Sequence, residues 1–208
     1  IPAEPTHEYP EEQRAETLGR LDITKPYILF VGTIEPRKNV LNLLEAYKRL
    51  PERLRNKFTL VVVGRVGWNC DAEVAALKQA VEDGYDVRYA GYVDDDTRSI
   101  LYHDATLFTT ASHYEGFGMP VLEAMSYGRP SAVSNIPVFK EVGGTAVEYF
   151  DQTKPAAIAD TWAQLLDDPK KLVEMSRASK AHADSHTWDD VAAVVHDAIM
   201  KHVKKPKR

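Results

Sequence analysis

The sequence holds 208 residues, of which 44% are hydrophobic and 27% are charged, and its formal net charge is -5. A chain of this size and composition can bury about 70% of its unfolded surface and fold as an ordinary globular domain. The sequence contains no apolar run long enough for a membrane-spanning helix, and its acidic balance argues against general nucleic-acid binding.

The single cysteine, Cys70, rules out a disulfide within the chain. This usage is typical of a reducing compartment, so we expect a cytoplasmic protein. The sequence begins at Ile1 rather than Met and shows no signal peptide. We therefore expect a fragment or a processed piece of a longer protein.

The chain opens with a polar segment that contains three prolines and a helical pattern over residues 11–21. We interpret residues 1–25 as a linker or hinge segment on the surface. Residues 26–32 form a continuous apolar run that ends in glycine, which predicts a buried parallel strand. The following helix is predicted from apolar residues at helical spacing, namely Val40, Leu43, Leu44 and Tyr47.

This alternation of strand and helix continues along the chain. Further strands are predicted over residues 58–64, 87–91, 105–110, 131–134 and 146–150, and helices over residues 71–83 and 96–102. The alternation predicts an α/β fold, a Rossmann-like parallel sheet of about six strands flanked by helices on both faces. We expect this domain to span residues 26–187.

From residue 153 onward the chain is predicted to be helical, with apolar stripes over residues 155–166, 169–183 and 188–203. Residues 188–208 are interpreted as a terminal helix and a basic tail. The tail carries Lys201, Lys204, Lys205, Lys207 and Arg208. A solvated end and a peripheral contact with anionic lipid are both consistent with it.

The functional interpretation rests on residues 109–130. An apolar strand leads there into a turn bracketed by Gly116 and Gly118, and a helix follows with Pro120 in its first turn, where a missing N–H costs nothing. The start of a helix offers unpaired amides and about half a positive charge. The amides of Gly118 and Met119 are therefore predicted to bind an anion.

Two carboxylates, Glu115 and Glu123, flank this helix start with seven residues between them. Helical side chains lean back toward the N-terminus, so Glu123 is expected to face the same ligand. A carboxylate beside a diphosphate is repelled by it unless the carboxylate accepts hydrogen bonds from a neighbouring group. Sugar hydroxyls are the natural donors of such hydrogen bonds. The pattern indicates a phosphorylated ligand that carries a sugar.

The run from Glu115 to Glu123, Glu-Gly-Phe-Gly-Met-Pro-Val-Leu-Glu, resembles the E-x7-E motif of retaining glycosyltransferases of family 4, which have the GT-B fold. Residues 32–39 (Gly-Thr-Ile-Glu-Pro-Arg-Lys-Asn) and residues 124–130 (Ala-Met-Ser-Tyr-Gly-Arg-Pro) also resemble that family, in the family's order. The resemblance covers roughly residues 26–188. It implies the C-terminal, donor-binding half of a two-domain enzyme, whose N-terminal acceptor-binding domain is absent from these residues.

The resemblance also implies which cations act. Lys38 would offset the charge that develops on the departing nucleoside diphosphate, at the carboxyl end of the first strand where ligands bind in open α/β sheets. The family usually places an arginine directly after Gly32, where this sequence has Thr33. Arg37 either replaces that arginine or is a surface residue.

The same resemblance implies that Glu115 lies beside the donor sugar. The alternative interpretation is that Glu115 is a solvent-exposed acid in a loop. The resemblance also implies that Glu123 binds the ribose diol. The alternative interpretation is that Glu123 only complements the helix dipole. Tyr92 and Val93 follow the third strand, where the family contacts the nucleobase. The expected donor-binding set is Gly32, Thr33, Arg65, Tyr92, Val93, Gly116, Phe117, Gly118, Met119, Pro120, Val121 and Glu123, with Lys38, Arg37 and Glu115 as catalytic residues.

Asp94, Asp95 and Asp96 resemble a metal cluster, but they precede a predicted helix, so we expect them to cap it. The resemblance implies no metal and no cofactor beyond the nucleotide sugar, because Lys38, Arg37 and the helix start take the role of a cation.

The intact enzyme would move a hexose from a GDP- or UDP-linked sugar to an acceptor hydroxyl with retention of configuration, the departing phosphate accepting the proton. Residues 32–39 resemble mannosyl- and rhamnosyltransferases of bacterial surface polysaccharide synthesis, which favours GDP-mannose. We expect this fragment alone to bind donor weakly and to transfer little. One alternative is a non-catalytic nucleotide-sugar-binding or interaction module. The other is an NAD-type Rossmann enzyme, which would need a G-x-G-x-x-G motif after the first strand, and residues 32–37 do not supply that motif.

Overall fold

The structure is a computed structural model that describes residues 7–185 and 188–202. Six strands form one parallel sheet in the order β3-β2-β1-β4-β5-β6. They are β1 Tyr27–Val31, β2 Thr59–Val63, β3 Val87–Gly91, β4 Leu107–Thr110, β5 Ser131–Ser134 and β6 Glu148–Phe150. This sheet confirms the predicted α/β, Rossmann-like fold.

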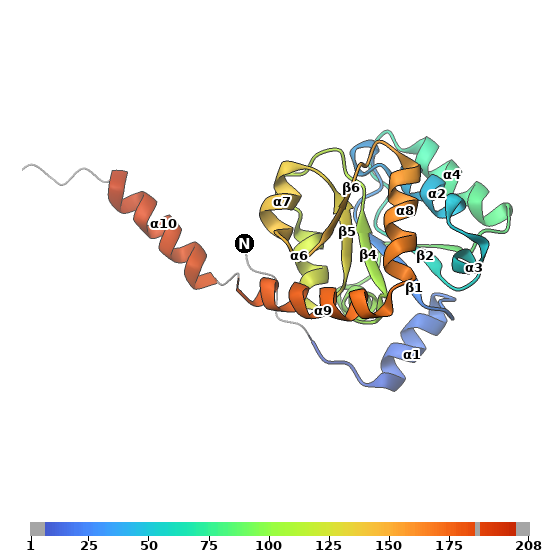
Figure 1. Cartoon of the computed structure of the whole chain (residues 1–208), viewed down its shortest axis with the longest axis horizontal. Helices are drawn as coiled ribbons and strands as arrows, with labels where there is room; N and C mark the ends of the chain where they lie inside the picture. The colour runs from blue at the N-terminus through green and yellow to red at the C-terminus, as the bar shows by residue number, and fades with distance from the viewer. Residues whose placement is uncertain (1–6, 186–187, 203–208) are drawn as a thin grey trace, which may run out of the picture.

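Helices cover both faces of the sheet (Figure 1), with α2, α4 and α8 on one side and α6 and α7 on the other. The helices are α1 Glu11–Arg20, η1 Pro36–Lys38, α2 Val40–Arg49, α3 Glu52–Arg55, α4 Asp71–Glu82, α5 Asp95–Asp104, α6 Met119–Ser126, α7 Pro137–Gly143, α8 Pro155–Leu166, α9 Pro169–Asp184 and α10 Trp188–His202. The layers explain why β1 and β2 are buried along their whole length and why both are apolar without alternation.

Successive residues of a strand point to opposite faces, and β1 feeds both cores in this way. Ile28 and Phe30 pack in the core with α2, α4 and α8. Leu29 and Val31 pack in the core with α5, α6 and α7.

The strand order reverses between β1 and β4, because the chain runs outward from β1 to β3 and then returns to pair β4 with β1. Open α/β sheets bind ligands at such a switch point, outside the carboxyl ends of the strands. The loops that follow β1 and β4 therefore meet at the edge of the sheet where the sequence predicts a ligand.

Three short helices were not predicted, namely η1, α3 and α7. Each has seven residues or fewer, too short for an apolar stripe to repeat. Strand β4 begins at Leu107 rather than at residue 105, because Ala105 is the C-terminal cap of α5.

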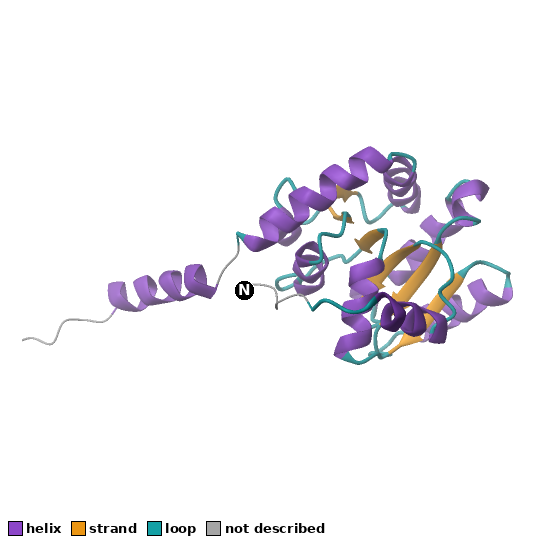
Figure 2. Cartoon of the chain, turned by 90° about the horizontal axis from the view of Figure 1, so that it is seen from below, coloured by secondary structure: helices purple, strands orange, loops and turns teal. Residues whose placement is uncertain are grey.

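The last described helix, α10, lies apart from the sheet in both views (Figures 1 and 2). Four of its apolar side chains, Val194, Val195, Ile199 and Met200, are exposed. The predicted basic tail from Lys204 to Arg208 lies outside the described residues. Within the described ranges, none of the helices combines the length and apolar character that a membrane crossing requires.

Candidate functional site

The loop after β1 holds the two predicted cations in a fixed turn. Pro36 begins η1, and Asn39 ends it in the left-handed region at φ 58°. The Asn39 side chain donates to the carbonyl oxygens of Ala111 at 3.1 Å and Gln152 at 2.8 Å. These bonds tie the turn to the segments that follow β4 and β6, so the residues before Asn39 are oriented by the fold.

Lys38 and Arg37 converge on one carboxylate. Lys38 Nζ lies 2.5 Å from Glu115 Oε1, and Arg37 NH1 lies 2.5 Å from Glu115 Oε2. Ser112 Oγ donates to Glu115 Oε1 at 2.7 Å, and Arg37 NH2 also pairs with Glu35 Oε1 at 2.6 Å. Two cations and two acids, Lys38, Arg37, Glu35 and Glu115, form what we call the ion cluster.

The ion cluster is largely shielded from solvent. The side chains of Lys38 and Glu115 are 8% and 9% exposed, whereas Arg37 is 27% exposed. Burial acts to raise the pKa of Glu115, but hydrogen bonds from Lys38 and Ser112 and the charge of Lys38 outweigh it, so this pKa lies below its ordinary value. The cluster as a whole is neutral.

Helix α6 begins where the sequence predicts, next to the ion cluster. Gly118 caps it at φ 95°, and a Cβ there would lie 2.8 Å from the Phe139 ring. Only glycine fits both constraints. In the part of the chain that the structure describes, the amides of Gly118 and Met119 donate to no protein acceptor, so the anion-binding groups expected here are available.

Glu123 faces a different element from Glu115. Its Oε2 accepts a hydrogen bond from the buried Tyr102 hydroxyl of α5 at 2.9 Å. The same carboxylate lines a cavity of about 170 Å³ between α5 and α6. The other lining residues are His7, Tyr9, Asp95, Asp96, Arg98, Ser99, Tyr102, Ser126 and Tyr127.

The two acids thus contact different neighbours: Glu115 contacts the β1 loop and Glu123 contacts α5. None of the residues of the ion cluster lines the cavity that Glu123 faces. The cavity is smaller than the roughly 300 Å³ of a site for a whole drug-sized ligand.

Arg65 and Tyr92, predicted to line the donor cleft, lie together at the ends of β2 and β3. The Arg65 guanidinium stands 4.0 Å from the centre of the Tyr92 ring. Val93 is partly buried against the core that includes α5 and α6. In the described ranges, neither Arg65 nor Tyr92 shares a hydrogen bond or ion pair with the ion cluster.

The predicted cap of α5 is confirmed, because Asp94 accepts from the Thr97 amide at 2.7 Å. This backbone hydrogen bond lowers the pKa of Asp94. Asp94 thus acts as a helix cap.

Sequence reasoning missed Glu35, Ser112 and Tyr114. Glu35 pairs with Arg37, and the Tyr114 ring lies 5.8 Å from the Arg37 guanidinium carbon. Ser112 could have been suspected from its place three residues before Glu115, whereas Glu35 and Tyr114 look like ordinary loop residues in the sequence.

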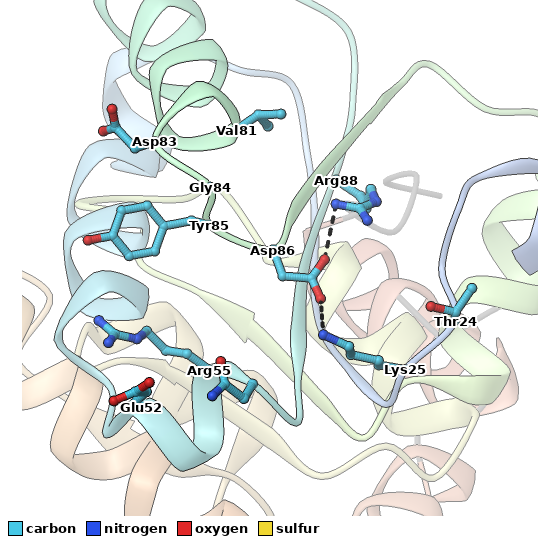
Figure 3. Close-up of a pocket in the computed structure, with 11 residues that line it drawn as sticks. Thr24, Lys25, Glu52, Arg55, Val81, Asp83, Gly84, Tyr85, Asp86 and Arg88 are labelled. Carbon is cyan, nitrogen blue, oxygen red and sulfur yellow. Dashed lines mark hydrogen bonds and ion pairs between the residues drawn. The ribbon is translucent and has the colours of Figure 1, made fainter.

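A second cavity, of about 540 Å³, is lined mainly by residues that precede β1, β2 and β3, at the edge of the sheet where these strands begin (Figure 3). Asp86 stands in its wall and pairs with Lys25 at 2.8 Å and Arg88 at 3.0 Å. Arg88 also pairs with Asp22 at 2.9 Å, so two carboxylates balance these two cations, and none of the predicted site residues lines this cavity. It is therefore separate from the candidate site.

A family model described as glycosyl transferases group 1 matches residues 13–182. The chain belongs to this family. The resemblance inferred from the three sequence motifs is therefore confirmed, and the Lys38, Arg37 and Glu115 cluster lies within the matched region of this group 1 glycosyltransferase domain.

Relatives of the domain are longer proteins. The O-antigen chain mannosyltransferase B of Escherichia coli is 37% identical over 164 residues, which cover 79% of this chain and 43% of that protein. Sucrose-phosphate synthase from Thermosynechococcus elongatus has a TM-score of 0.74 at 21% identity, covering 90% of this chain and 48% of that one. Anabaena Alr3699/HepE, solved in complex with UDP and glucose, has a TM-score of 0.79 at 16% identity. The match covers 94% of this chain and 53% of that one. The chain spans about half the length of these three relatives.

Proposed function

We propose that residues 26–187 are the donor-binding half of a retaining glycosyltransferase, which moves a hexose from a nucleotide diphosphate sugar to an acceptor hydroxyl. The observation that carries the proposal is the ion cluster beside the start of α6, where Lys38 and Arg37 meet one carboxylate and two amides are free. An N-terminal acceptor-binding domain of a longer protein completes the enzyme.

Binding of the donor exchanges partners within the ion cluster. The diphosphate takes over Lys38, Arg37 and the amides at the start of α6, while Glu115 turns to the hydroxyls of the donor hexose. The cluster is neutral before the exchange, so the released carboxylate must find new donors, and sugar hydroxyls supply them. Arg37 then replaces the arginine that the family places at Thr33, a role supported by the carboxylate that it shares with Lys38.

In the reaction the bond between the anomeric carbon and the phosphate oxygen breaks, and its electron pair leaves with the nucleoside diphosphate. The acceptor oxygen bonds to the same face of the anomeric carbon, and its proton passes to the departing phosphate. Lys38 and Arg37 stabilise the charge that develops on that phosphate. The proposal includes no metal and no cofactor apart from the donor.

The nucleoside extends from the ion cluster toward α5. Its ribose diol donates to Glu123, whose position is held by the Tyr102 hydroxyl. The base lies near Tyr92, Val93 and Arg65, at the ends of β2 and β3.

The proposed hexose is mannose, carried by GDP in preference to UDP, for an acceptor of bacterial surface polysaccharide synthesis. Support comes from the Escherichia coli relative, which is named as an O-antigen chain mannosyltransferase. The proposed location is the cytoplasm, with the basic tail after residue 203 holding the enzyme against anionic lipid.

A non-catalytic nucleotide-sugar-binding or interaction module is the second candidate. The observation that favours it is Thr33, which leaves the position directly after Gly32 without the family's arginine. In that case Arg37 serves only to neutralise Glu35 and Glu115.

Calorimetric titration of the chain with GDP and UDP tests the proposal. Lys38→Ala and Glu123→Ala are expected to weaken binding, whereas Lys25→Ala, at the opposite edge of the sheet, leaves it unchanged. Indifference of the folded chain to both nucleotides, or equal effects of all three variants, would contradict the donor-binding role.

A further inference from the structure

A third cavity, of about 580 Å³, lies between the C-terminal end of α6 and α9. Its charged lining comprises three basic side chains and two acids, namely Arg129, Arg177, Lys180, Glu8 and Asp184. Lys180 pairs with Asp184 at 2.8 Å. Among the described residues, Arg129 and Arg177 form no ion pair, and the exposed Glu8 forms none either.

The guanidinium of Arg129 is held in the cavity wall by backbone carbonyl groups. Its Nε donates to the Tyr127 oxygen at 2.8 Å and its NH1 to the Ala105 oxygen at 3.3 Å. A guanidinium has five N–H groups, and these bonds use only two of them. Burial lowers the pKa of Arg129, because a cation withdrawn from water is unfavourable unless it is paired. An anion in the cavity would supply the missing partner.

Asp104, whose charge acts on Arg129, is engaged by another cation. It pairs with Arg14, and His103 Nδ1 lies 2.8 Å from it. The Nε atom of Arg14 is buried and has no hydrogen-bond partner within the described ranges. One carboxylate therefore serves two arginines, and positive charge is in excess beside the cavity.

Close packing of α6 against α9 fixes the walls of the cavity. Gly128 follows α6 at φ 64°, and a Cβ there would lie 3.4 Å from the Ser176 carbonyl oxygen and 3.7 Å from Lys180 Cβ. The ion cluster lies at the other end of α6, which has 8 residues and is about 12 Å long. The cavity is thus a separate site from the one proposed for the donor.

We propose that this cavity binds a phosphate monoester. Near pH 7 such a group carries a charge of about -1.5 to -2, which matches Arg129 and Arg177 together, whereas a carboxylate matches only one of them. Its oxygens accept the paired N–H groups that arginine presents. The cavity is larger than a phosphate group alone, so it also admits an organic group beside Tyr127 and Ala181. The monoester is either a soluble metabolite or the headgroup of phosphatidic acid.

An NMR titration of the 15N-labelled, 208-residue chain with glycerol 3-phosphate tests this inference. Glycerol 3-phosphate is expected to shift the amide signals of Gly128 and Arg177, whereas glycerol is not. The affinity is expected to fall about tenfold in Arg129→Gln and in Arg177→Gln. Glu8→Gln removes an acid from the cavity wall and is expected to strengthen binding about twofold.

The matched control is Lys170→Gln, which removes an exposed positive charge from the same helix outside the cavity. Lys38→Ala removes a cation of the ion cluster, to which the proposed function also assigns phosphate. Both variants are expected to keep the parent affinity at the amides of the cavity. Because Arg177 is exposed and unpaired among the described residues, Arg177→Gln is expected to fold like the parent chain even if Arg129→Gln does not.

Cosedimentation with phosphatidylcholine vesicles, with and without phosphatidic acid, distinguishes the two sources of the phosphate. Binding to phosphatidic acid that is lost in Arg177→Gln identifies the lipid headgroup, and its absence beside binding of glycerol 3-phosphate identifies a soluble monoester. Absence of binding to both probes would overturn the inference. Equal affinities in the parent chain and Arg177→Gln, or an equal loss in Lys170→Gln or Lys38→Ala, would overturn it too.

Discussion

Replacing Glu115 with glutamine keeps the size of the side chain and removes the charge that holds the ion cluster together. Glu115 now bonds to both Lys38 and Arg37, each at 2.5 Å. A diphosphate must compete with this carboxylate for both cations. In Glu115→Gln the net charge of the cluster changes from zero to +1, with Glu35 as its remaining acid.

We therefore expect the variant to bind GDP and UDP more tightly. A hydrogen bond to a charged group contributes about 1.5–3 kcal/mol net, which corresponds to roughly tenfold to hundredfold in affinity. Because Arg37 is partly exposed, the lower end applies, and the expected gain is about tenfold. The nucleotide sugar gains less than the free nucleotide, because its hexose loses the carboxylate.

Isothermal titration calorimetry with GDP, UDP and the corresponding hexose donors measures both effects. The free energy of unfolding is expected to fall by about 1–3 kcal/mol, because buried Lys38 loses its anionic partner. Urea unfolding of the same samples checks this loss. Weaker binding of both free nucleotides by folded Glu115→Gln would refute the exchange of partners, since Glu115 would then assist phosphate binding.

Four further predictions concern single positions. Arg37→Ala is expected to weaken GDP or UDP binding about tenfold, with partial recovery in Arg37→Lys; equal affinities in the parent and Arg37→Ala by calorimetry would return Arg37 to a surface role. Glu123→Ala is expected to weaken nucleotide binding but leave inorganic diphosphate binding unchanged, and an equal loss for both ligands would speak against a ribose contact. Gly118→Ala is expected to lower the free energy of unfolding by about 1–3 kcal/mol, because of its positive φ and its overlap with Phe139; unchanged urea unfolding would contradict this. The pKa of Glu115 is lowered in the folded chain, so its contribution to stability is present above its unfolded pKa and is lost as pH falls through the folded pKa. The parent chain is therefore expected to lose more free energy of unfolding on acidification than Glu115→Gln. Parallel curves of unfolding free energy against pH for the two chains would count against this linkage.

The sheet could be predicted from the sequence because its central strands are buried on both faces. Residues 26–32 and 58–64 are continuous apolar runs, and the structure places β1 and β2 inside them. The start of α6 could also be predicted, because Gly118 and Pro120 have specific backbone requirements at a helix N-terminus.

The pairing of the charged side chains within the site could not be predicted from sequence patterns. Arg37 and Lys38 meet Glu115 across 78 and 77 residues of chain, and only the pairing of β1 with β4 brings them together. The family resemblance assigned Glu115 to the donor sugar, and in the structure its carboxylate pairs with both Lys38 and Arg37. Glu35 carried no local signal, because a loop acid before proline is common on protein surfaces.

The most direct test of the central claim is a crystal structure of the chain with GDP or UDP bound. The account predicts the diphosphate within hydrogen-bond distance of Lys38 Nζ, Arg37 and the Met119 amide, with Glu115 released from at least one of its two cations. A nucleotide bound instead in the cavity beside Lys25 and Asp86, with the ion cluster unchanged, would contradict it.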